Sequence, residues 1–97
     1  MLGLRQQLLG DEAFALAQFE RAAELAPDMD MAHYFVGQGN VFLAQAGGTI
    51  DGERLAAAEA AFDQALALNP ANPRAQSGAG SIHYLRAQAL LLSLIHI

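Results

Sequence analysis

The 97-residue sequence contains no cysteine, no tryptophan and no lysine, and only three prolines. The absence of cysteine excludes a disulfide framework and thiolate metal sites. All five basic residues are arginines scattered singly along the chain, against ten acidic residues and a net charge of −5. Since binding to nucleic acid normally requires a basic stripe, we expect no nucleic-acid partner.

Long apolar runs are also missing. The longest, residues 89–97, is interrupted by Ser93 and His96 and is far shorter than the roughly 20 residues that span a bilayer. The first residues lack the cationic start and the apolar segment of a signal peptide. We therefore expect a soluble protein without a membrane span, and the sequence leaves cytoplasmic and periplasmic locations both open.

Hydrophobic residues make up 54% of the chain, and 21 residues are alanine. Alanine is the best helix former and lets helices approach closely. Valine and threonine are nearly absent, and no segment alternates in the manner of a strand. The composition predicts an all-α fold of closely packed helices.

Helical periodicity and capping signals predict five helices. We expect Asp11 to cap the second helix, Thr49 or Asp51 the fourth, and Asn72, followed by Pro73 at the first helical position, the fifth. The first predicted helix ends near Gly10, and the second begins at Asp11 and ends before Pro27. The third begins at Asp28 or Asp30 and ends at Gly47-Gly48. The fourth runs from about Glu53 to Leu68, and the fifth runs from Pro73 towards Leu92.

One pattern, Ala-x3-Phe-x2-Ala-x4-Pro, occurs twice in the chain. Every matched residue of the second copy lies 43 positions after its counterpart, which indicates an internal repeat. The matched residues are Ala15, Phe19, Ala22 and Pro27 in the first copy and Ala58, Phe62, Ala65 and Pro70 in the second.

This pattern resembles the second helix of the tetratricopeptide repeat. The first helix of that repeat carries a Leu-Gly pair, and Leu2-Gly3, Val36-Gly37 and Ala79-Gly80 occupy the same place here. The resemblance covers about residues 2–88 and implies an α-α superhelix, or solenoid, of antiparallel helical hairpins. In such an array small residues let the two helices of a hairpin touch, and the Phe fills the gap between hairpins.

The resemblance divides residues 1–92 into a single domain of about two and a half repeats, namely a partial repeat at 1–27, a repeat at 28–70 and a partial repeat at 71–92. The family period is about 34 residues, so roughly nine residues are added, and we place them within 44–57. We interpret this insertion either as neutral length variation or as a contact loop for a neighbouring domain.

The two ends of the chain interrupt the pattern, and we expect the chain to be a fragment of a longer bacterial array. The stretch 92–97 resembles translated adapter sequence. We accordingly interpret residues 93–97 as a non-native tail.

Catalytic and metal-binding patterns find little support. Asp30 and His33 are three residues apart, but no further His, Cys or acidic cluster completes a metal site. We expect His33 and His83 to be packing residues, because the resembled family places aromatic residues there. No cofactor and no enzymatic activity are expected.

The resemblance instead implies a concave groove that is lined by first helices and binds a protein or peptide. Some members of the family bind the C-terminal carboxylate of a partner with a cluster of Lys, Arg and Asn residues. Such a clamp is not favoured here, because the chain has no lysine and Arg74 stands nearly alone. The aromatic residues among the candidates either bind an apolar or amphipathic segment or pack between hairpins. The candidate groove residues are Met31, Tyr34, Gln38, Val41 and Phe42 in the second repeat and Arg74, Ser77, Ser81, Tyr84 and Leu85 in the third.

We therefore predict a non-catalytic scaffold that binds a peptide or protein segment. The alternative is a regulatory or substrate-presenting segment of a larger enzyme, signalling protein or cytochrome-assembly protein.

Overall fold

The computed structural model describes the backbone of residues 2–95 and the side chains of residues 9–95. The described residues form four helices and no strand, so the all-α prediction is confirmed. The packing role predicted for the Leu2-Gly3 pair and the side chain of His96 lie outside this description. The helices are α1 (Leu2–Leu25), α2 (Asp30–Gln45), α3 (Gly52–Leu68) and α4 (Pro73–Ile95).

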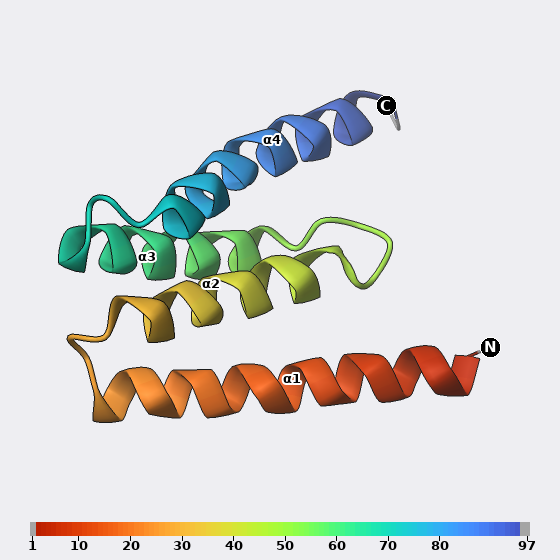
Figure 1. Ribbon diagram of the computed structural model, residues 1–97. Coiled ribbons are helices and arrows are strands. Elements are labelled where there is room, and N and C mark those ends of the chain that lie inside the picture. Colours follow the sequence, from red (N-terminus) through yellow and green to blue (C-terminus); the bar gives the residue numbers. More distant parts are fainter. Residues whose placement is uncertain (1, 96–97) are drawn as a thin grey trace.

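Each helix runs back along the helix that precedes it, and α4 crosses the others obliquely (Figure 1). Helix α2 is the central element, because it contacts α1, α3 and α4, whereas α1 contacts only α2 among the described helices. This arrangement is consistent with an array of helical hairpins. The described chain is flat, with extents of 43 × 31 × 19 Å.

The helix end predicted near Gly10 is wrong, because α1 continues through Gly10 and Asp11 without interruption. A glycine ends a helix effectively when it adopts the left-handed conformation, and Gly10 has no positive φ. Within a helix, glycine costs only about 1 kcal/mol relative to alanine. The first two predicted helices are therefore one helix, and residues 2–25 do not form a hairpin.

The other helix boundaries follow the local signals. Gly48, with φ of 84°, is the one described residue in the left-handed region, and it follows the end of α2. The carboxylate of Asp51 caps α3 by accepting hydrogen bonds from the backbone N–H groups of Glu53 at 2.9 Å and Arg54 at 3.2 Å. The side chain of Asn72 caps α4 in the same way, accepting from the N–H groups of residues 74 and 75.

The core is centred on Phe62, whose side chain is 0% exposed. Its ring lies between two glycines of neighbouring helices: a Cβ atom at Gly37 of α2 or at Gly78 of α4 would lie 2.5 Å from the ring. The close approach of both helices to Phe62 therefore depends on these glycines. The residues that form the core cluster with Phe62 are Ala44, Leu55, Ala58, Ile82 and Leu85.

The segment 44–57, where we placed the insertion, contributes to this core. It contains the end of α2, the connection to α3 and the first turns of α3. Ala44 and Leu55 belong to the buried cluster, and Ile50 packs against it. The segment 44–57 is thus partly built into the hydrophobic core and does not form only a surface loop.

Candidate functional site

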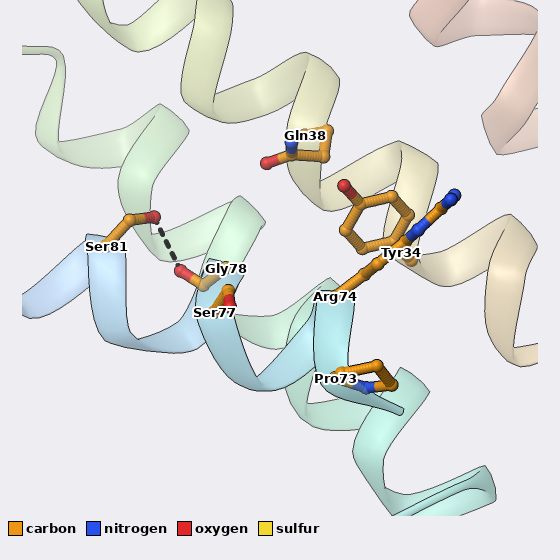
Figure 2. A pocket seen from close by; sticks show the side chains of 7 residues that line it. All are labelled: Tyr34, Gln38, Pro73, Arg74, Ser77, Gly78 and Ser81. Carbon is orange, nitrogen blue, oxygen red and sulfur yellow. Dashed lines mark hydrogen bonds between the residues drawn. The ribbon is translucent and has the colours of Figure 1, made fainter. Parts of the chain in front are cut away.

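A candidate site is a cleft of about 400 Å³ between α2 and the first half of α4. Figure 2 shows the side chains that line it, with those of α2 facing those of α4. Five of the candidate groove residues are among them. The lining residues are Tyr34 and Gln38 of α2 and Pro73, Arg74, Ser77, Gly78 and Ser81 of α4.

The polar side chains of the cleft are largely uncommitted. Among the described residues, Gln38, Arg74 and Ser77 have no side-chain hydrogen bond or ion pair with another residue, and all three are exposed. Ser81 differs, because its hydroxyl donates a hydrogen bond of 2.7 Å to the carbonyl oxygen of Gly78 (Figure 2). The cleft thus offers an amide, a hydroxyl and one cation to a ligand, and none of its seven lining residues carries a carboxylate.

Tyr34 serves both the core and the cleft. Its ring centroid lies 6.1 Å from that of Phe62 and 5.2 Å from that of Phe35, in an edge-on arrangement with the latter. The side chain is half-buried, and it also forms part of the cleft lining. For this residue the two roles that the sequence left open, partner binding and packing between hairpins, are therefore compatible.

The remaining candidates do not line the cleft. Met31 is half-buried, and its sulfur contacts the Nδ2 atom of Asn72 at 3.6 Å. Val41 packs against the core cluster, and Leu85 belongs to it, so Leu85 is not a groove residue. Phe42 and Tyr84 are exposed, by 46% and 70% respectively.

Two lining residues were not predicted. Pro73 was assigned a helix-starting role, and it also forms one end of the cleft. Gly78 is missing from the candidates because the family pattern draws attention to Gly80, yet Gly78 is the glycine that packs on Phe62. The repeat relates Gly78 to Phe35, 43 positions earlier, but only the structure shows that Phe35 stacks on the first-copy Phe19.

Beside the cleft, Asp30 connects α2 to the turn between α3 and α4. Its Oδ2 atom accepts hydrogen bonds from the side-chain amides of Asn69 at 3.1 Å and Asn72 at 3.0 Å. The bond from Asn69 is the main cause of a lowered pKa of the Asp30 carboxyl; desolvation opposes it, and the bond from Asn72 adds to it. Since Asn72 is itself buried and caps α4, this network determines how α4 begins relative to α2.

The histidines have separate roles. The Nε2 atom of His33 donates to the carbonyl oxygen of Pro27 at 2.9 Å, and the ring is half-buried. His83 is exposed, so the expectation that it packs is wrong. Among the residues that the structure describes, no three His, Cys, Asp or Glu side chains are grouped so that they could hold a metal ion.

One surface carboxylate is paired with an arginine of the neighbouring helix. Glu59 of α3 accepts two hydrogen bonds from the guanidinium of Arg86 of α4, at 2.6 and 3.3 Å, and this pairing lowers its pKa. Both side chains are well exposed to water, so the pair contributes little to stability.

Comparison with known proteins adds no assignment, since no family model, curated protein or solved structure matches the chain. Over its described residues, the protein also has no helix with both the length and the apolar character that crossing a membrane requires.

Proposed function

We propose that this chain is a non-catalytic interaction module, a segment of an α-solenoid of the tetratricopeptide type, that binds a peptide segment of a partner protein in the α2–α4 cleft. One observation carries the proposal. Residues selected as groove-facing from the family resemblance line a single cleft, although Gln38 is about 40 positions away from Ser77 and Ser81 in the sequence.

The chemistry of the cleft supports a peptide as the ligand. A volume of about 400 Å³ accommodates a few side chains. The uncommitted groups of Gln38 and Ser77 suit hydrogen bonds to a peptide backbone, and the ring of Tyr34 provides an apolar surface. Arg74 is the one charged group in the lining, so the cleft tolerates an acidic residue in the peptide.

The proposal is tested by selecting peptides from a displayed random library on the immobilised intact chain. The affinity of each selected peptide is then measured by fluorescence anisotropy. We expect Ser77→Trp to weaken binding at least tenfold, because the indole occupies the cleft. Ser77 is preferable to Tyr34 for this test because it is exposed, whereas Tyr34 contacts the core.

The matched control is Gln64→Trp, which places the same side chain at an exposed position of α3 outside the lining. Binding should be unchanged in this variant. Peptides that bind equally well to both variants, or a library that yields no binder, would contradict the proposed site.

A further inference from the structure

The face of α2 that α3 covers is formed by four residues at helical spacing. Gly37 contacts the Phe62 ring, and the Oδ1 atom of Asn40 accepts a hydrogen bond of 3.1 Å from Arg54 of α3. Val41 packs against the core cluster, and Ala44 belongs to it. The helix that carries the second copy of the repeated pattern, α3, thus packs on a surface of α2 that consists of a glycine, a polar residue, a medium-sized residue and an alanine.

The same face recurs 43 positions later on α4. Gly80, His83, Tyr84 and Ala87 are the counterparts of these four residues, and we call them the outer α4 face. Their spacing places them on one side of the helix. All four are exposed, and a Cβ atom at Gly80 would meet nothing within 4 Å.

The outer α4 face is distinct from the surfaces already described. The buried residues of α4, which face the rest of the molecule, are Ala75, Gly78, Ile82 and Leu85. At 3.6 residues per turn, Gly80 lies nearly opposite both Gly78 and Ile82. None of the four residues of the outer face lines the α2–α4 cleft.

We propose that the outer α4 face binds an amphipathic helix of a partner protein that carries a small-x3-aromatic-x2-small stripe. The occupant is inferred from the internal repeat, since the two faces hold corresponding positions and α3, which carries the second copy of the repeated pattern, covers the first. Gly80 leaves room for an aromatic ring, as Gly37 does for Phe62, and Ala87 permits the close approach that Ala44 permits. Tyr84 supplies a larger contact surface than Val41 does.

The probe for this site is a fluorescently labelled synthetic peptide of residues 52–70, because this segment covers the equivalent face of α2. Its binding to the intact chain is measured by anisotropy. We expect saturable binding that Gly80→Leu weakens at least tenfold, since the new side chain occupies the space for the ring. A peptide carrying Phe62→Ala should bind at least tenfold more weakly to the unmodified chain.

The matched control is Gly10→Leu, which changes another exposed helical glycine with nothing within 4 Å. Circular dichroism establishes that both variants are folded. Ser77→Trp should leave the peptide affinity unchanged, which separates this surface from the α2–α4 cleft. Equal binding to the two leucine variants would mean that the peptide displaces α3 or binds elsewhere, and that result would overturn the proposal, as would the absence of binding.

Sedimentation velocity tests whether a second copy of the chain binds the outer α4 face instead. If the chain associates with itself and Gly80→Leu abolishes the association, the outer α4 face binds a second copy, and the proposed partner helix is overturned. We expect the unmodified chain to sediment as a monomer.

Discussion

Phe19 and Phe62 hold the same place in two copies of one sequence pattern, yet their environments differ. The Phe62 ring is fully buried between Gly37 and Gly78, and the Phe19 ring is half-buried and stacks on Phe35 at a centroid distance of 4.8 Å. In both copies the ring contacts the next helix along the chain. The facing residue 16 positions later is a phenylalanine in the first copy and a glycine in the second.

This difference shows that the partner position controls how deeply a repeated aromatic residue is buried. Gly78 has no side chain, so α4 approaches the Phe62 ring directly. Phe35 occupies the corresponding space, and the Phe19 ring stacks beside it. In the interface between α1 and α2, the buried side chain is instead that of Leu16, which packs against Gly39.

The turns that precede α2 and α4 differ in a related way. Met29 stands at the N-cap of α2 and makes no side-chain capping bond. Its counterpart 43 positions later is Asn72, which caps α4 and also donates to Asp30. The turn before α4 is therefore stabilised by polar side-chain contacts of Asn72 that Met29 does not make in the turn before α2.

The largest effect is expected at the second-copy phenylalanine. Phe62→Ala should lower the free energy of unfolding by about 3–5 kcal/mol, because it leaves a cavity between three helices. Urea denaturation followed by circular dichroism measures this loss. Phe14→Ala, at a side chain that is 68% exposed, is the control and should change stability by no more than about 0.5 kcal/mol. A loss of less than about 1 kcal/mol at Phe62 would refute the packing described here.

Gly78→Ala tests whether the glycine permits the burial of the ring. The added Cβ atom would lie 2.5 Å from Phe62, and we expect a loss of about 1–3 kcal/mol from overpacking. Gly80→Ala, two residues away in open space, should instead stabilise the helix by up to about 1 kcal/mol. In a Phe62→Ala background the cost of Gly78→Ala should vanish, and an unchanged cost would show that the two positions are not coupled.

Phe19→Ala should have a smaller effect than Phe62→Ala. We expect a loss of about 1–2 kcal/mol, because part of the ring remains in water and an aromatic stack adds only about 0.5–1.5 kcal/mol to the burial of area. A double-mutant cycle with Phe35→Ala, measured by urea denaturation, isolates the contribution of the stack. Equal losses at Phe19 and Phe62 would remove the contrast between the two copies.

The Asp30 network should produce a modest dependence of stability on pH. Its pKa is lowered in the folded protein, so the stabilisation is present above the ordinary carboxyl value of about 4 and is lost as the pH falls through the folded value. Unfolding midpoints in urea between pH 6 and pH 2 should fall more for the unmodified chain than for Asp30→Asn. Glu59 titrates in both proteins, so the comparison isolates Asp30. Parallel curves would exclude a contribution from this carboxylate.

Much of the local structure could be predicted from short sequence signals. Gly48, Asp51, Asn72 and Pro73 determine where three helices begin or end, because each acts through its own backbone angles or through bonds to the next two or three residues. The same reasoning failed at Gly10. A glycine only weakens a helix, and no local bond required the chain to turn there.

The candidate site could be predicted in part. The family resemblance pointed to residues of α2 and α4 that share the cleft, such as Gln38 and Ser77. It did not distinguish Leu85, which is buried, from its exposed neighbour Tyr84. That distinction depends on which side of α4 faces Phe62, and Phe62 lies more than 20 positions earlier in the chain.

The amino-acid sequence by itself determined the helical character of the chain, the bounds of α2, α3 and α4, and the 43-residue repeat, since all of these depend on local preferences and on spacing. The tertiary structure determined the unbroken course of α1, the unequal burial of Phe19 and Phe62, and the exposure of the outer α4 face. These features depend on which residue a distant helix presents at each contact, and a glycine or a phenylalanine at that point changes how closely two helices approach.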